Sequence, residues 1–193
     1  MNEIEVKVLD INKSNLINKL KSIDATLVKR EFQNNYMFDY PDNRFFSKGG
    51  YVRIRKSFSL LDNKEKVVLT FKELVSRDKF KVSKEIEFKA DDFQSAKDFL
   101  EALGLKVFRL DEKFRESYKL EEGLIEIDTW AGVPTYFEAE AESEEKVEIL
   151  LNKLGYQLSQ STSMTLAEIM KHYNIEDSNR LFSEEDKKLL LGY

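Results

Sequence analysis

Three stretches of this chain begin with the same pattern, a Glu-x-Glu pair in which acidic and apolar residues alternate. They read EIEVKVLD from Glu3, EIEFKADD from Glu85 and EAEAESEE from Glu138. In a β-strand, residues i and i+2 point to the same face, so each pair would project two carboxylates from one side of a strand. Carboxylate oxygens are preferred ligands of hard cations. The pattern therefore indicates a site for a divalent cation such as Mg²⁺ or Mn²⁺.

Basic residues show the same alternation with apolar residues, so they too would lie on the charged faces of the predicted strands. They occur singly or in i, i+2 pairs, as in YVRIR and EKFRESY, and they are Lys7, Arg53, Arg55, Lys72, Lys113 and Arg115. Arginine forks and lysine ammonium groups bind phosphate oxygens well. Carboxylates alone would repel phosphate, so acids and bases on one surface imply a bridging cation. The combination favours a site for a polyphosphate together with metal ions.

The elements that must position these side chains follow from residue periodicity. Alternation predicts strands over residues 3–9, 26–40, 51–58, 65–73, 81–90, 105–120, 124–131 and 134–142. Helical spacing and capping residues predict helices over residues 12–22, 92–103, 143–154 and 164–173, with a further helix after Ser183. Residues 74–80 are predicted to form a charged loop, and residues 105–120 to bend near Asp111.

Two arrangements of the strands are compatible with charge on one face and apolar residues on the other. In an open antiparallel sheet, the charged faces would simply be exposed to solvent. In a closed barrel of about eight strands, they would line an interior with room for side chains or one small ligand. Buried charges require partners, so such an interior suits a hydrated site for a polyanion and cations. The clustering of charges by sign favours the barrel.

Composition restricts the class of protein. The chain has 193 residues, of which 35% are charged, yet its net charge is only −5 and it contains no Cys. A balanced charge does not favour a nucleic-acid partner, since such proteins commonly carry strongly basic surfaces. The sequence contains no long apolar run and no apolar core of a signal peptide. We expect a soluble, cytoplasmic protein with no membrane partner.

The ordered set of motifs resembles the CYTH superfamily, the triphosphate tunnel metalloenzymes, through residues 1 to about 170. EIEVK at Glu3 is similar to the N-terminal signature of that superfamily. The other segments that carry the resemblance are FDYPDNRF, VRIR, LTFK, EIEF, EKFRESY and EIDTWAGVPTYFEAE. FDYPDNRF is similar to the segment before the Arg-x-Arg strand in the bacterial adenylyl-cyclase-like branch.

The resemblance implies an α+β fold, in which eight antiparallel strands close into a tunnel with a charged interior and flanking helices. It implies that Mg²⁺ or Mn²⁺ is bound by Glu3, Glu5, Asp128, Glu138 and Glu140. It implies that a triphosphate is bound by Lys7, Arg53, Arg55, Lys72, Lys113 and Arg115. Of the carboxylates, Glu5, Asp128 and Glu140 are the predicted catalytic residues. The tunnel domain is expected over residues 1–173, with a helical tail over residues 174–193.

Some residues depart from the pattern or have a simpler interpretation. Relatives often carry Arg two residues before the central Glu-x-Glu pair, where this chain has Ser83, and Lys81 on the same face is a candidate substitute. Glu85 and Glu87 are expected to pair with tunnel bases rather than to bind metal. Trp130 is expected to pack beneath a helix rather than to stack on a base.

Three functions remain open at this point. The first is a metal-dependent triphosphatase that acts on an inorganic or organic triphosphate, such as tripolyphosphate, ATP or thiamine triphosphate. The second is a class IV adenylyl cyclase, which makes cyclic AMP and pyrophosphate from ATP. The third is a non-catalytic module that binds polyphosphate or nucleotide. His172 is the one histidine and lies far from the motifs, so triads that require His are not expected.

The expected partner is a small-molecule triphosphate. Members of the superfamily are often dimers, so a homodimer is a further expectation. Residues 178–193 lie beyond the resemblance and are expected to form a docked helix without a catalytic role.

Overall fold

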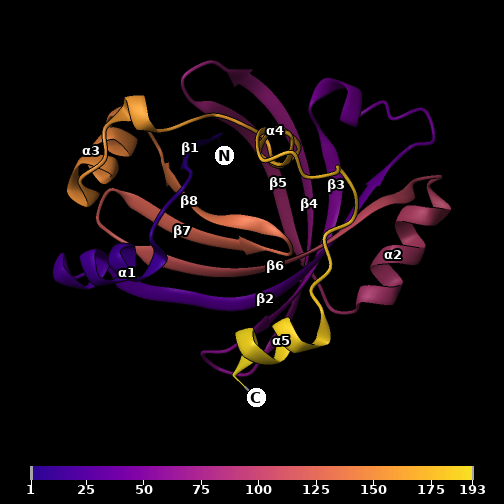
Figure 1. Cartoon of the computed structure of the whole chain (residues 1–193). Coiled ribbons are helices and arrows are strands. Elements are labelled where there is room, and N and C mark those ends of the chain that lie inside the picture. The colour runs from indigo at the N-terminus through magenta and orange to yellow at the C-terminus, as the bar shows by residue number, and fades with distance from the viewer. Residues whose placement is uncertain (1, 193) are drawn as a thin grey trace.

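An antiparallel barrel is the main feature of the computed structural model, which describes the backbone of residues 2–192 and the side chains of residues 4–192. Within that range, eight strands close in the order β1-β5-β4-β3-β2-β6-β7-β8 (Figure 1). The strands are β1 (Asn2–Val8), β2 (Thr26–Asp39), β3 (Tyr51–Ser59), β4 (Glu65–Arg77), β5 (Lys81–Ala90), β6 (Lys106–Lys119), β7 (Gly123–Trp130) and β8 (Val133–Ala141). The predicted closed barrel is therefore confirmed, and the open sheet is not.

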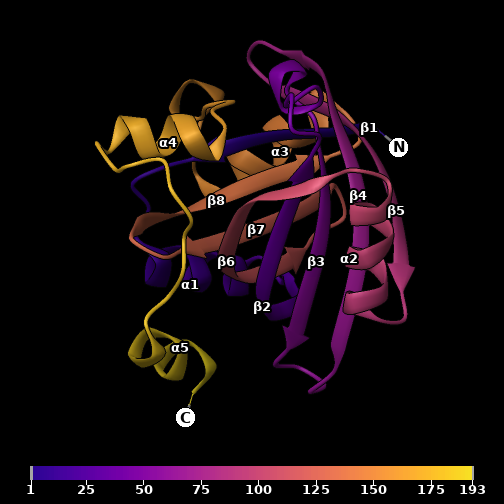
Figure 2. The same cartoon turned by 90° about the vertical axis from the view of Figure 1, so that its right-hand side faces the viewer.

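Helices flank the barrel. They are α1 (Lys13–Ser22), α2 (Phe93–Ala102), α3 (Glu144–Leu154), α4 (Leu166–His172) and α5 (Glu184–Leu191). Helices α1 and α3 lie on one side of the barrel and α2 lies on the opposite side (Figures 1 and 2). The N-cap residues are Asn12 of α1, Asp92 of α2, Ser143 of α3 and Ser183 of α5. Each cap side chain accepts a hydrogen bond from a backbone N–H of the first turn, which fixes where the helix begins.

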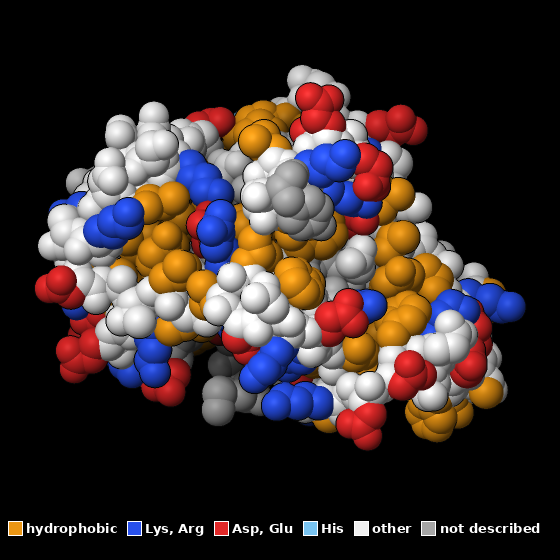
Figure 3. Space-filling view, turned by 90° about the horizontal axis from the view of Figure 1, so that it is seen from below, with side chains coloured by type: hydrophobic (Ala, Val, Ile, Leu, Met, Phe, Trp, Pro, Cys, Tyr) orange, Lys and Arg blue, Asp and Glu red, His pale blue; other side chains and the backbone are white. Residues whose placement is uncertain are grey.

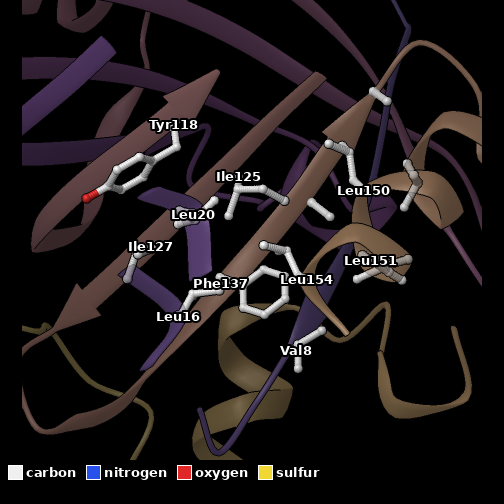
Figure 4. Packing of buried hydrophobic residues seen from close by; sticks show 14 of the residues in the cluster. Val8, Leu16, Leu20, Tyr118, Ile125, Ile127, Phe137, Leu150, Leu151 and Leu154 are labelled. Atoms are coloured by element: carbon white, nitrogen blue, oxygen red, sulfur yellow. The ribbon is translucent and has the colours of Figure 1, made fainter. Parts of the chain in front are cut away.

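The larger hydrophobic core lies between the outer face of the barrel and helices α1 and α3. Ile125 and Ile127 of β7 and Phe137 of β8 are fully buried against residues such as Leu20 and Leu150 (Figure 4). Because side chains alternate along a strand, these outward apolar residues direct Glu126, Asp128 and Glu138 to the barrel interior. Burial of the outer face thus fixes which residues line the inside.

One predicted boundary was wrong. β4 was expected to end at residue 73, before a charged loop over residues 74–80, but it continues to Arg77. The register shifts between Leu74 and Ser76, and pairing then continues as far as Arg77 and Lys81. Most side chains of this hairpin end are exposed, so no apolar alternation marks the strand in the sequence.

The surface carries both signs of charge. Acidic and basic side chains are intermixed with apolar groups on the face that Figure 3 shows. This mixture agrees with the small net charge of −5. Among residues 2–192, no helix is both long and apolar enough to cross a membrane.

Candidate active site

The barrel encloses a cavity of about 400 Å³. Its volume lies within the range of about 300–1,000 Å³ that small-molecule sites usually have. All six predicted phosphate-binding bases line it, and so do three of the predicted metal-binding carboxylates: Lys7, Arg53, Arg55, Lys72, Lys113, Arg115, Glu5, Glu138 and Glu140. The closed sheet brings these residues together because alternate residues of every strand face one interior space.

The carboxylates gather where β1 pairs with β8. In this register Glu5 lies opposite Glu140, and Lys7 lies opposite Glu138. Residues directly opposite each other in an antiparallel pair have Cβ atoms about 4.5–5.5 Å apart. Glu3 belongs to the same strand, but its side chain lies outside the described residues, so its predicted role in metal binding stays a prediction.

Lysines neutralise this group of carboxylates. Lys7 Nζ lies 2.6 Å from Glu5 Oε1 and 3.1 Å from Glu138 Oε1, and Lys81 Nζ lies 2.8 Å from Glu5 Oε1. Burial alone would raise both carboxyl pKa values. The charges of Lys7 and Lys81 nevertheless hold the pKa of Glu5 well below its usual value. Lys7 and Arg115 lower the pKa of Glu138 to about 2. Both carboxylates are therefore ionised at neutral pH.

Asp128 has a different position from the other predicted carboxylates. It is fully buried and is not among the residues that line the cavity. Arg115 donates to both of its oxygens, with Nε–Oδ1 and Nη2–Oδ2 distances of 2.6 Å, and Lys113 Nζ donates to Oδ2 at 3.0 Å. Asp128 thus holds the side chains of two bases that line the cavity, Arg115 and Lys113, without lining the cavity itself.

The bases are crowded against one another. Burial, together with the charges of Arg53 and Arg115, lowers the pKa of Arg55 to about 10. Burial and the charge of Arg115 likewise lower the pKa of Lys113 to about 7, although Asp128 opposes this. Repulsion among cations in a buried space favours binding of an anion between them.

Glu85 and Glu87 pair with cavity bases, as expected from the sequence. Lys72 Nζ lies 2.5 Å from Glu85 Oε1, and Arg53 Nη2 lies 3.7 Å from Glu87 Oε2. Thr70 Oγ1 also donates to Glu87 Oε2 at 2.9 Å. The candidate substitute Lys81 lines the cavity, whereas Ser83 is buried and does not line it.

Trp130 packs against residues of α4, as expected, but it also lines the cavity. Its Nε1 donates to Tyr136 Oη at 2.8 Å, and Lys113 Nζ lies 4.8 Å from the centre of its rings. The expectation that Trp130 would only pack beneath a helix was incomplete. The residue is two positions after Asp128, and this spacing keeps it on the interior side of β7.

The cavity is also lined by residues that were not predicted as site residues, among them Lys29, Arg109 and Asp111. The alternation of Arg109, Asp111, Lys113 and Arg115 along β6 is the signal that could have revealed two of them. The bend expected near Asp111 hid this pattern, whereas β6 pairs with β2 from Lys106 to Lys119. His172 is exposed at the end of α4, as expected.

The donors of the site are suited to a hard cation, although they are engaged by bases in this structure. Among the side chains of residues 4–192, no group of three or more His, Cys, Asp or Glu is arranged to hold a metal ion. Glu5 and Glu138 instead contact Lys7, Lys81 and Arg115. Ionised carboxylates remain the ligand type that Mg²⁺ and Mn²⁺ prefer, so the residues present fit such an ion.

Comparison with solved structures identifies chains with the same fold. PH1819 of Pyrococcus horikoshii OT3 has a TM-score of 0.73 and 23% identity, covering 89% of this chain and 99% of that one. HpAC1 of Hippeastrum has a TM-score of 0.66 and 19% identity, covering 91% of this chain and 98% of that one. HpAC1 is described as a provisionally named adenylyl cyclase with a dominant triphosphatase activity.

Comparison of sequences identifies the family. MJ0240 of Methanocaldococcus jannaschii, which carries a provisional adenylate cyclase name, is 29% identical over 140 residues. The alignment covers 72% of this chain and 77% of that protein. The profile of the CYTH domain matches residues 1–168. This match spans all eight strands of the barrel and helices α1, α2 and α3, and the chain therefore belongs to the CYTH domain family.

Proposed function

We propose that the protein is a divalent-metal-dependent triphosphatase that hydrolyses a phosphoanhydride bond of a triphosphate bound in the barrel. One observation carries the proposal: a single cavity is lined both by bases for a polyphosphate and by ionised carboxylates for a cation. Family membership supports it, because the family contains triphosphatases and proteins named adenylate cyclases.

The bases bind and orient the triphosphate. Arg53, Arg55 and Arg115 present guanidinium forks that match phosphate oxygens, and the lysines add positive charge along the cavity. Asp128 holds one edge of the Arg115 guanidinium, through Nε and Nη2, which leaves less conformational freedom to be lost when a phosphate binds. Positioning of this kind accounts for much of the catalysis in phosphoryl transfer.

Glu3, Glu5, Glu138 and Glu140 are the residues that would hold Mg²⁺ or Mn²⁺. A bound divalent cation supplies charge stabilisation to the phosphates during hydrolysis. Glu5 and Glu140 line the cavity and are suited to accept a hydrogen bond from an attacking water. Asp128 instead acts through Arg115 and Lys113, which makes it a positioning residue within the predicted catalytic set.

An adenylyl cyclase is the second candidate. It is supported by the adenylate cyclase name of the archaeal relative and by the aromatic and apolar residues Tyr51, Met37 and Trp130, which add a non-polar surface to the cavity wall. Cyclisation would use the same bases and cation but would require a ribose hydroxyl to attack the inner phosphorus.

A product assay distinguishes the candidates. Purified protein is incubated with tripolyphosphate, ATP or thiamine triphosphate in Mg²⁺ and then Mn²⁺, and orthophosphate, pyrophosphate and cyclic AMP are resolved. Orthophosphate is the expected product. Cyclic AMP with matching pyrophosphate would establish the cyclase instead, and metal-independent binding with no product would leave a binding module.

Trp130 offers a direct measurement of ligand binding. It is the one tryptophan of the chain, it lines the cavity, and its rings lie beside Lys113. Because a phosphate bound by Lys113 would change the surroundings of the indole, we expect a saturable change in tryptophan fluorescence as tripolyphosphate is added. Calorimetry provides the control, since heat of binding without any change in fluorescence would place the ligand away from Trp130.

A further inference from the structure

The tail completes the wall of the barrel where β7 is too short to do so. β6 pairs with β2 from Lys106 to Lys119, but it pairs with β7 only from Lys113 onward. Beside the remaining part of β6, the chain between α4 and α5 runs as an extended segment (Figure 2). Asp111 and Arg180 form a parallel bridge there.

Hydrogen bonds join this tail segment to the uncovered part of β6. The Leu110 N–H donates to Asn179 Oδ1 at 3.1 Å, and the Glu112 N–H donates to the Arg180 carbonyl at 2.6 Å. The Arg180 N–H in turn donates to Asp111 Oδ1 at 2.9 Å. The tail therefore takes the place that β7 occupies further along β6, although it lies beyond the family match to residues 1–168.

The same tail fixes the side chain of Arg109. Arg109 lines the cavity, and its Nη1 lies 2.5 Å from Oδ1 of Asp177 in the tail. Its Nε lies 2.5 Å from Asp111 Oδ2. The guanidinium is planar and rigid, so contacts at two of its nitrogens determine the direction of the third.

The third nitrogen of Arg109 has a weak partner. Among the described residues, Nη2 contacts Met170 Sδ at 3.9 Å, and a thioether is a poor hydrogen-bond acceptor. Arg109 also stands in register with Met37, which is in turn opposite Arg53 on the next strand. Adjacent strands lie about 4.8 Å apart, so Arg109 is two strands away from a predicted phosphate-binding base.

We propose that Arg109 is a further triphosphate-binding residue and that Asp177 of the tail positions it. This inference rests on the proposed function, because it assigns one more contact to the same anionic substrate. Asp177 is about half exposed, and exposed ion pairs contribute little stability. Its contribution is to orient the guanidinium so that Nη2 is available to a phosphate oxygen.

The test compares four variants under steady-state conditions with tripolyphosphate and Mg²⁺: Arg109→Ala, Arg109→Lys, Asp177→Asn and Lys187→Ala. A hydrogen bond between charged groups contributes enough that Arg109→Ala should raise KM about tenfold, with a smaller change in kcat. Arg109→Lys should recover part of this loss because it restores the charge without the fork. Asp177→Asn should raise KM by a smaller factor.

Lys187→Ala is the matched control. It removes a tail-to-barrel ion pair, Lys187 with Glu112 at 3.0 Å, but neither residue lines the cavity, so KM should not change. Hydrogen exchange of the Leu110 and Glu112 amides shows whether each variant retains the docked tail. Arg109→Ala with a docked tail and an unchanged KM would overturn the inference.

Metal-free binding of tripolyphosphate separates this inference from the proposed function. If the unaltered protein binds tripolyphosphate without hydrolysing it, weaker binding by Arg109→Ala would still support the inference while the triphosphatase is rejected. Equal binding by both would reject the role of Arg109. If the unaltered protein neither binds nor hydrolyses it, both proposals fail.

Discussion

Replacement of Glu5 by Gln should reduce metal-dependent hydrolysis of tripolyphosphate by about 100-fold or more, because a correctly held cation supplies several kcal/mol of transition-state stabilisation. Glu5 is ionised in the cavity, where Lys7 and Lys81 lie within 2.8 Å of its carboxylate. Gln keeps the size of the side chain but removes its charge. Initial rates of orthophosphate release measure the loss.

Glu85→Gln is the control for this variant. Glu85 is also a cavity carboxylate paired with a lysine, since Lys72 Nζ lies 2.5 Å from it. Because it is expected to pair with bases rather than to hold the cation, most of the activity should remain. Metal-free binding of tripolyphosphate should be unchanged or tighter in Glu5→Gln, since a negative charge is removed. Equal loss of activity in both variants would contradict the assignment.

Asp128→Asn should lower the free energy of unfolding by about 3 kcal/mol, at the lower end of the usual effect of removing one charge from a buried ion pair, because Arg115 retains Glu126 and Glu138 as partners. Arg115 and Lys113 are both almost completely buried, and both donate to the Asp128 carboxylate. Asn cannot balance either charge. Urea denaturation monitored by circular dichroism measures the change.

Asp42→Asn provides the comparison for Asp128→Asn. Asp42 also accepts hydrogen bonds from Nε and Nη2 of an arginine, Arg44, but both side chains are exposed. Solvent screens that pair, so the midpoint of the urea transition should stay where it is. If Asp128→Asn also left the midpoint of the urea transition unchanged, the Asp128 carboxylate would not stabilise Arg115 and Lys113 as we infer.

The barrel and the inward direction of its charges could be predicted because charged and apolar residues alternate along most of its strands. Ile125 and Ile127 alternate with Glu126 and Asp128, so burial of the first pair determines where the second pair points. Helix limits could be predicted for a similar local reason, since Asn12 and Ser143 cap their helices through their own side chains.

Features that depend on pairing between distant segments could not be predicted. Asp128 is buried behind Arg115 and Lys113 because β6 pairs with β7, and the sequence of β7 alone does not show this pairing. Arg109 contacts Asp177 of the tail, about seventy positions away in the sequence. β4 extends beyond its apolar residues because β5 continues to pair with it.

The metal dependence of orthophosphate release from tripolyphosphate is the most direct test of a metal-dependent triphosphatase in the barrel. We expect release in Mg²⁺ or Mn²⁺, loss of release when EDTA removes the cation, and recovery when the cation is restored. Glu5→Gln should remain inactive at every metal concentration at which the unaltered protein is active. Release that continues in EDTA, or a fully active Glu5→Gln, would contradict a metal-dependent triphosphatase in the barrel.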